Sequence, residues 1–369
     1  MNASTSCILT ITCSTTTNAS TENKLDKKVL LGMTPAQLRE VAVGEGLKPF
    51  VGKQLAKWLY EKRATEFSVM TDISVAGRER LAKKYVIGRE LPLKEALSAD
   101  GTAKYLFRGV NGRDVEAVYI PDRERATLCV SSQAGCKMNC SFCMTGKQGF
   151  HGNLTAAQII NQVLSVPGSE NLTNIVFMGM GEPMDNLNEV MRAIEILTEP
   201  WGLAWSPKRI TVSSIGKLKE LKELLDRTKV HVAISIHSPY PQERHGLMPV
   251  EGAYPITEVI ALLREYDFSH QRRLSFEYIM WRGVNDDLRH ADALARLLRG
   301  LDCRVNLIRF HAIDGAEHLQ PCSQETMVRF RDRLNDAGIT ATIRASRGED
   351  IDAACGMLAG KQNLNKESK

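Results

Sequence analysis

The sequence has no apolar run approaching the roughly 18 residues needed to cross a bilayer. The apolar fragment at residues 7–13 is interrupted by threonine and follows no basic segment, so it does not resemble a secretory signal. A large excess of one charge is also absent, since the formal net charge is +5. We therefore expect a cytoplasmic protein without membrane contact, and the charge gives only weak support for a nucleic-acid partner.

A disulfide scaffold is excluded as well. Such scaffolds are short secreted chains with too little core, whereas this chain has 369 residues, of which 43% are hydrophobic and 25% charged. That length accommodates one large domain and a smaller module. Its nine cysteines are better explained as reduced thiols, some of them ligands.

The first 123 residues divide into three segments. Residues 1–28 are rich in Ser, Thr and Asn without apolar periodicity, which predicts a flexible tail. Residues 29–90 place apolar residues such as Leu55 and Leu59 at helical spacing with interleaved Lys and Arg, which predicts a small helical domain. Residues 91–123 alternate like short strands around two turns, which predicts a β-extension.

Residues 124–346 alternate between strand and helix patterns. We predict strands near 127–132, 174–179, 208–213, 231–236, 274–280 and 304–309. We predict helices near 155–166, 187–198, 216–227, 256–266, 287–299 and 324–336, the first with a capping box at Thr155 and Gln158. These units imply an α/β fold with a parallel sheet, closed as a partial (β/α)6 TIM-like barrel, and residues 340–343 add an edge strand.

Three thiols follow the first barrel strand, at Cys136, Cys140 and Cys143. They therefore lie at the face of a barrel where catalytic residues gather. A [4Fe–4S] cluster that only carries electrons takes four protein ligands, so the missing fourth ligand is informative. An open iron can bind the amino and carboxylate groups of S-adenosylmethionine (SAM). By spacing alone, a zinc knuckle completed by His151 remains an alternative.

Three separated blocks, at residues 126–150, 178–183 and 347–356, resemble the RlmN type of dual-specificity ribosomal and transfer RNA adenine-C2 methyltransferase. These are radical SAM enzymes related to the Cfr antibiotic-resistance methyltransferases, and the similarity runs from about residue 34 to residue 360. The resemblance implies a radical SAM barrel, a [4Fe–4S] cluster on the three cysteines and two SAM molecules per turnover. Because basic residues are interleaved along residues 29–90, we predict that they form an accessory RNA-binding domain, and we predict residues 347–369 to be a catalytic loop and tail.

The resemblance also implies the mechanism. Adenine C2 is not nucleophilic, so Cys355 first takes a methyl group from one SAM by displacement. A radical from a second SAM abstracts hydrogen from that methyl group, and the resulting methylene radical adds to C2. After loss of an electron, Glu116 matches the base that removes the C2 proton. Cys129 then attacks the sulfur of Cys355, which releases methyladenosine and leaves a disulfide.

Several residues at the carboxyl ends of barrel strands match the family's SAM-binding positions. They are Gly181, Glu182, Ser213, Ser235, Ile236, His237 and His311. His311 departs from the pattern, because the family commonly has Asn there, and Arg309 replaces a proline. Cys7, Cys13, Cys303 and Cys322 match no part of the mechanism.

We expect 23S rRNA and tRNA as partners of a monomeric chain, with an electron donor such as a flavodoxin or ferredoxin system. The closest rival function is Cfr-type methylation of adenosine C8 in rRNA. A zinc-stapled RNA-binding protein is an alternative of another class. A radical SAM enzyme acting on a protein or small molecule would leave Cys129 and Cys355 without a purpose.

Overall fold

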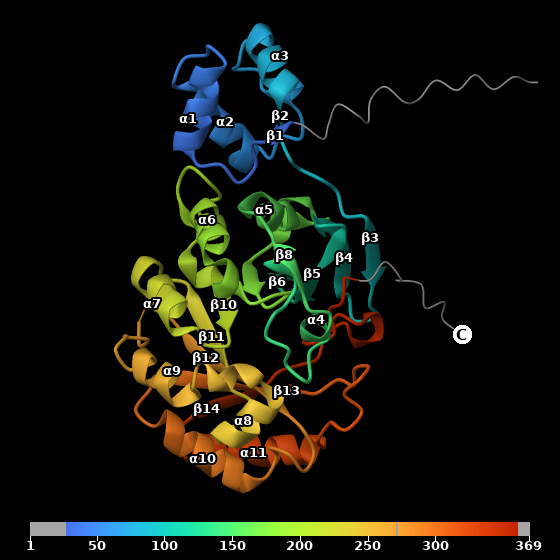
Figure 1. The fold of residues 1–369 in the computed structure, drawn as a ribbon, viewed down its shortest axis with the longest axis vertical. Coiled ribbons are helices and arrows are strands. Elements are labelled where there is room, and N and C mark those ends of the chain that lie inside the picture. Colours follow the sequence, from blue (N-terminus) through green and yellow to red (C-terminus); the bar gives the residue numbers. More distant parts are fainter. Residues whose placement is uncertain (1–26, 271, 361–369) are drawn as a thin grey trace, which may run out of the picture.

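The computed structural model describes residues 27–270 and 272–360 (Figure 1). Nearly all of the predicted flexible tail, with Cys7 and Cys13, lies outside these residues, as does the stretch from 361 onward. Within them, no helix has the length and apolar character needed to cross a membrane.

A small helical module opens the described chain, as predicted. Its elements are β1 (Lys28–Val29), α1 (Pro35–Gly44), α2 (Val51–Ala56), η1 (Lys57–Glu61), η2 (Phe67–Val69), α3 (Val75–Lys84) and β2 (Tyr85–Val86). Thr34 and Gln37 form a capping box that begins α1. The sequence patterns do not reveal the short parallel pair β1–β2, because two residues carry no periodicity.

One ten-stranded sheet forms the body, in the order β14-β13-β12-β11-β10-β9-β6-β5-β4-β3. The predicted β-extension is its antiparallel part: β3 (Lys94–Leu97), β4 (Ala103–Val110) and β5 (Arg113–Asp122). The barrel strands are β6 (Arg125–Cys129), β9 (Asn174–Phe177), β10 (Ile210–Ser214), β11 (His231–Ser235), β12 (Leu274–Met280), β13 (Cys303–Arg309) and the edge strand β14 (Thr340–Ile343). Parallel pairing from β6 to β14 confirms the partial barrel.

The six predicted barrel helices are also present. They are α5 (Ala156–Ser165), α6 (Leu187–Thr198), α7 (Leu218–Arg227), α9 (Ile256–Leu263), α10 (Leu288–Leu298) and α11 (Gln324–Asp336). Unpredicted elements are the hairpin of β7 (Gln133–Gly135) and β8 (Phe150–Asn153), with α4 (Met144–Lys147) and α8 (Pro241–Leu247). Short 3-10 segments complete the connections: η3 (Ser169–Asn171), η4 (Pro183–Asn186), η5 (Pro207–Arg209), η6 (Pro249–Gly252) and η7 (Glu349–Ile351).

The parallel strands curl around a common interior. Arg344, directly after β14, donates from Nη1 to the Met178 sulfur, directly after β9, over 3.6 Å. Five strand spacings separate β14 from β9, which would place them about 24 Å apart in a flat sheet. The contact therefore requires strong curvature, and it brings residues from opposite ends of the sheet to one interior.

Candidate active site

Strand register places the predicted base and the predicted resolving cysteine on one face of the sheet. Cys129 on β6 lies opposite Val118 on β5, and Val118 lies opposite Lys104 on β4. Glu116 is two residues from Val118, so its side chain points to the same side. Cys129, Glu116 and Lys104 are all buried. The fold thus brings together Glu116 and Cys129, which the sequence predicted separately.

The cluster cysteines lie in the loop between β7 and β8. Cys136 and Cys140 are buried, and Cys143 precedes α4 and donates its N–H to the Cys140 carbonyl at 3.2 Å. Burial raises the pKa of the Cys136 thiol to about 12 and raises the pKa of Cys140, and the neighbouring cysteines act in the same direction. Cys136 and Cys140 are thus withdrawn from water, where a free thiolate without a metal partner is costly.

Three cysteines are the donor set that a [4Fe–4S] cluster with one open iron requires. Among the residues that the structure describes, no three His, Cys, Asp or Glu side chains are grouped to hold one metal ion. Three irons of a [4Fe–4S] cube would each take one of the three thiolates. His151 is also engaged elsewhere, since its Nε2 lies 3.1 Å from the Gln148 carbonyl. The donor set fits the cluster.

The segment carrying Cys355 packs against the cluster loop. The N–H of Met144 donates to the Gly356 carbonyl at 2.8 Å, and the Thr145 hydroxyl donates to the Leu358 carbonyl at 2.7 Å. Cys355 itself is exposed. Cys355 is therefore exposed on a segment that is hydrogen-bonded to the residue after Cys143.

The turn between β3 and β4 anchors the other end of this segment. Asp350 accepts hydrogen bonds from the Ser98 hydroxyl at 2.6 Å and the Ala99 N–H at 3.1 Å. Asp100 accepts from the Gly348 N–H at 3.1 Å. Burial alone would raise the pKa of Asp100, but its hydrogen bonds lower it to about 2. Figure 1 shows this carboxyl-terminal segment, in red, beside the β-extension.

Arg344 interacts electrostatically with both Cys129 and Cys355. Burial raises the pKa of Cys129 to about 12, the nearby Cys355 raises it further, and Arg344 opposes the rise. Cys355 is in turn the largest cause of the raised pKa of Arg344. The Arg344 guanidinium also lies 3.5 Å from Glu277. Arg344 was missed in the sequence, where it lies three residues before the block at 347–356 that contains Cys355.

Gly181 and Glu182 form a tight turn after β9. Gly181 has a φ of +99°, and a Cβ there would lie 2.5 Å from the Gln133 Cβ. The Glu182 carboxylate accepts the N–H groups of Met184 and Ile215, each at 3.1 Å. Burial raises the pKa of Glu182 to about 7. The carboxylate thus links the loops after β9 and β10.

Sequence comparisons agree with this geometry. The family model for the radical SAM superfamily matches residues 130–295, and the model for the ribosomal RNA large subunit methyltransferase N-terminal domain matches residues 29–87. A Parabacteroides distasonis protein named probable dual-specificity RNA methyltransferase RlmN is 58% identical over 92% of this chain and 99% of its own. A Geotalea uraniireducens protein named dual-specificity RNA methyltransferase RlmN is 42% identical over 91% of this chain and 98% of its own.

A solved structure extends the agreement to the fold. The crystal structure of a radical SAM methyltransferase from Sphaerobacter thermophilus superposes with a TM-score of 0.85 at 39% identity, covering 90% of this chain and all of that one.

The chain belongs to the RlmN family of radical SAM methyltransferases.

Membership in the RlmN family brings a [4Fe–4S] cluster and SAM as cofactors, and it sets aside the zinc-stapled binding protein. It also shows that the chain is an enzyme. The predicted disulfide is not formed in this structure, because Cys129 and Cys355 are free thiols.

The other residues matched to SAM-binding positions of the RlmN family differ in their surroundings. Ser213 and Ser235 are half-buried near the carboxyl ends of β10 and β11, and Ile236 is fully buried. The His237 ring packs on Phe142, and its Nδ1 accepts the Ile279 N–H at 3.0 Å. Burial lowers the pKa of His237 to about 3, so the ring is neutral.

His311 contacts the carboxyl-terminal segment. Its Nε2 lies 2.9 Å from the Ser346 hydroxyl, and its Nδ1 lies 3.1 Å from the Glu349 carboxylate. Both ring nitrogens are therefore occupied by residues near the catalytic block. Imidazole can serve two such partners at once, which explains how it is accommodated where the RlmN family commonly has Asn.

The basic residues of the RlmN amino-terminal domain are partly committed to local contacts. Lys62 lies over the Trp58 ring at 3.6 Å, Lys57 lies 3.9 Å from Glu61, and Arg63 donates to Ser169 on the barrel at 3.1 Å. Lys53 is exposed. The domain thus retains exposed basic groups, although part of its charge stabilises its own fold and its attachment.

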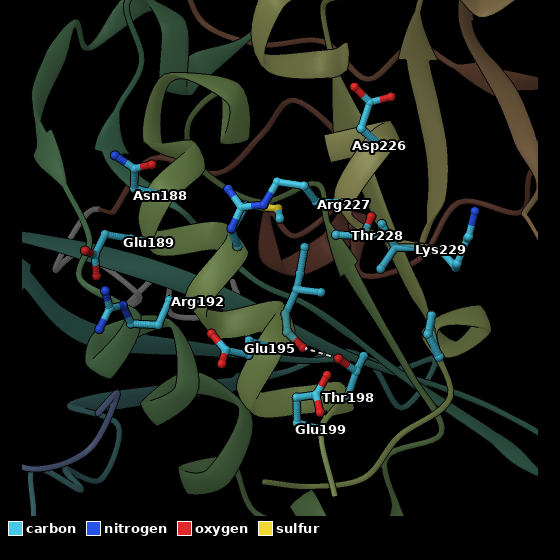
Figure 2. Close-up of a pocket in the computed structure, with 14 residues that line it drawn as sticks. Asn188, Glu189, Arg192, Glu195, Thr198, Glu199, Asp226, Arg227, Thr228 and Lys229 are labelled. Atoms are coloured by element: carbon cyan, nitrogen blue, oxygen red, sulfur yellow. Dashed lines mark hydrogen bonds between the residues drawn. The ribbon is translucent and has the colours of Figure 1, made fainter. Parts of the chain in front are cut away.

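A cavity of about 670 Å³ lies away from these residues, between α6 and α7 on the outside of the barrel (Figure 2). Figure 2 shows mixed charges around it, including Glu195, Arg192 and Asp226. Thr198 directs its hydroxyl to the Ile194 carbonyl at 2.8 Å, within the same helix. None of the predicted catalytic or SAM-binding residues lines this cavity.

Proposed function

We propose that this chain methylates C2 of a specific adenosine in 23S rRNA and of an adenosine beside the tRNA anticodon. The observation that carries the proposal is the position of the Cys355 segment. It contacts the cluster loop through Gly356 and contacts Glu116 through Ala359, whose N–H donates to the carboxylate at 2.8 Å. Names of the relatives, which are dual-specificity RNA methyltransferases, supply the substrate class.

In this proposal each cysteine has one role. Cys136, Cys140 and Cys143 hold the cluster, which with bound SAM supplies the one-electron chemistry. Cys355 carries the methyl group to the base, because an exposed thiolate is a competent nucleophile toward SAM. Glu116 accepts the C2 proton, and Cys129 attacks the sulfur of Cys355 to release the product.

We assign SAM contacts to the loops at the carboxyl ends of the barrel strands. The residues are Gly181, Glu182, Ser213, Ser235, Ile236, His237 and His311. Glu182 supports this assignment best, since it is buried at the turn after β9 and keeps acceptor capacity. For His237 the backbone is the more suitable group, because the ring is packed and hydrogen-bonded.

The domain boundaries belong to the proposal too. Residues 29–90 act as the accessory RNA-binding domain, which the family match over residues 29–87 supports. Residues 91–123 are the β-extension, 124–346 the barrel and 347–369 the catalytic loop and tail. The enzyme works as a cytoplasmic monomer and takes electrons from a flavodoxin or ferredoxin system.

The test is mass spectrometry of nuclease-digested RNA after reaction with SAM and a reductant. The expected product is 2-methyladenosine, with none formed by C355A. An 8-methyladenosine product alone would instead assign the Cfr-type function, which uses the same cysteines.

A further inference from the structure

A buried lysine stands beside the proposed base. Lys104 is 4% exposed, and its ammonium lies 3.3 Å from Oε1 of Glu116, itself 2% exposed. Removing two charges from water is costly unless each finds good partners. The mechanism described above does not use Lys104, so its retention in the interior requires an explanation.

The geometry makes this pair the attachment point of the Cys355 segment. Lys104 donates to the Asp352 carbonyl at 3.2 Å, three residues before Cys355. Glu116 accepts from the Ala359 N–H at 2.8 Å, four residues after Cys355. One ion pair therefore contacts the Cys355 segment on both sides of Cys355. The pair is a diagonal neighbour across β4 and β5, where rigid strands fix its geometry.

We propose that Lys104 is a positioning residue that orients Glu116 beneath the Cys355 segment through their buried ion pair. The inference rests on the proposed role of Glu116 as the base. A carboxylate without a partner would be costly in this buried site. Lys104 supplies that partner, and its contact with Asp352 aligns the methyl carrier with the base.

The step that Lys104 supports is a proton transfer with no net redox change. The C2–H bond of the RNA–protein adduct breaks, its electron pair stays with the purine, and the proton moves to the Glu116 carboxylate. Lys104 remains an ammonium throughout and keeps its hydrogen bond to Asp352. Glu116 takes part only in this step, so we expect methylation of Cys355 by SAM to proceed without the Lys104–Glu116 pair.

The experiment compares K104M, K104R and E116Q in the cluster-loaded enzyme, with tRNA as the RNA probe. R108M is the matched control, since Arg108 lies on the same strand and its side chain is 71% exposed. Intact-protein mass spectrometry follows two quantities, the methyl group on Cys355 and the covalent RNA adduct. Hydrogen exchange of residues 347–360 follows the docking of the segment.

For K104M we expect normal Cys355 methylation, accumulation of the adduct and a product rate lowered about 100-fold, within the range of general-base effects. Exchange in the segment should rise. K104R should recover most of the rate, and R108M should match the parent enzyme.

Normal product rates in K104M would overturn the inference, and so would loss of Cys355 methylation, which would make Lys104 a structural residue. Failure of the proposed function gives a different result, namely that E116Q releases product without accumulating adduct.

Discussion

The N–H of Met144 donates to the carbonyl of Gly356 at 2.8 Å, which ties the residue after Cys143 to the residue after Cys355. One hydrogen bond therefore joins the loop that carries Cys136, Cys140 and Cys143 to the segment that carries Cys355. Since hydrogen bonds at both ends of this segment fix its position, its docking is the structural condition for the reaction.

Release of the segment should impair catalysis without unfolding the barrel. In D350A the Ser98 hydroxyl and the Ala99 N–H lose their acceptor, so residues 347–353 should exchange backbone protons faster. We expect kcat to fall about 10-fold with little change in Tm, because Asp350 is a surface group. E258A, at an exposed position of α9, is the control. Unchanged exchange in D350A would contradict the docking role.

The two catalytic thiols should differ sharply toward iodoacetamide. Cys355 is exposed and should be alkylated first. Burial raises the pKa of Cys129 to about 12, so below that pH it is mostly a neutral thiol. Its alkylation rate should rise about tenfold per pH unit up to pH 12, for as long as the fold persists.

Cys303, whose pKa burial also raises to about 12, is the matched control for the alkylation experiment. Peptide mass spectrometry of the cluster-loaded enzyme gives the rates. Rapid alkylation of Cys129 at pH 7 would contradict its buried, protonated state.

Arg344 should assist the resolving step. Its guanidinium opposes the rise in the pKa of Cys129, so R344M should raise that pKa further and reduce the thiolate that attacks Cys355. We expect adduct resolution to slow about 10-fold in R344M and to recover largely in R344K, which keeps the charge. Quenched-flow sampling with mass spectrometry measures the decay of the adduct. Equal decay in all three proteins would exclude this role.

Gly181 should be irreplaceable for steric reasons. In G181A the new Cβ would meet Gln133, and the backbone would keep a φ of +99°. We expect a loss of about 1–3 kcal/mol in the free energy of unfolding and weaker SAM binding. G246A is the control, because nothing lies within 4 Å of a Cβ there. Thermal unfolding and equilibrium dialysis with SAM measure both effects, and a G181A protein that behaves like G246A would contradict the steric argument.

Periodicity predicted the regular elements because each barrel helix and strand buries one continuous face. The helix predicted near 187–198 matches α6 in both bounds. The hairpin β7–β8 and helix α8 were missed because they are short, and glycines at 135, 149 and 152 with positive φ interrupt any pattern.

The burial and partners of the site residues were not predicted, because they depend on contacts between distant parts of the chain. Glu116 looks like an exposed strand residue in the sequence, yet it is 2% exposed because the carboxyl-terminal segment covers it. Lys104 and Arg344 have no local signal, since their partners lie about 250 and 215 residues away in sequence, at Asp352 and Cys129. Only the folded chain brings these charges to the thiols and the base.

The central claim is that Cys129 releases the RNA from Cys355. Intact-protein mass spectrometry of C129A after reaction with SAM, reductant and RNA tests it most directly. The account predicts a stable covalent RNA adduct on Cys355 in C129A and none in the double variant C129A/C355A. Methylated RNA released by C129A without any adduct would contradict it.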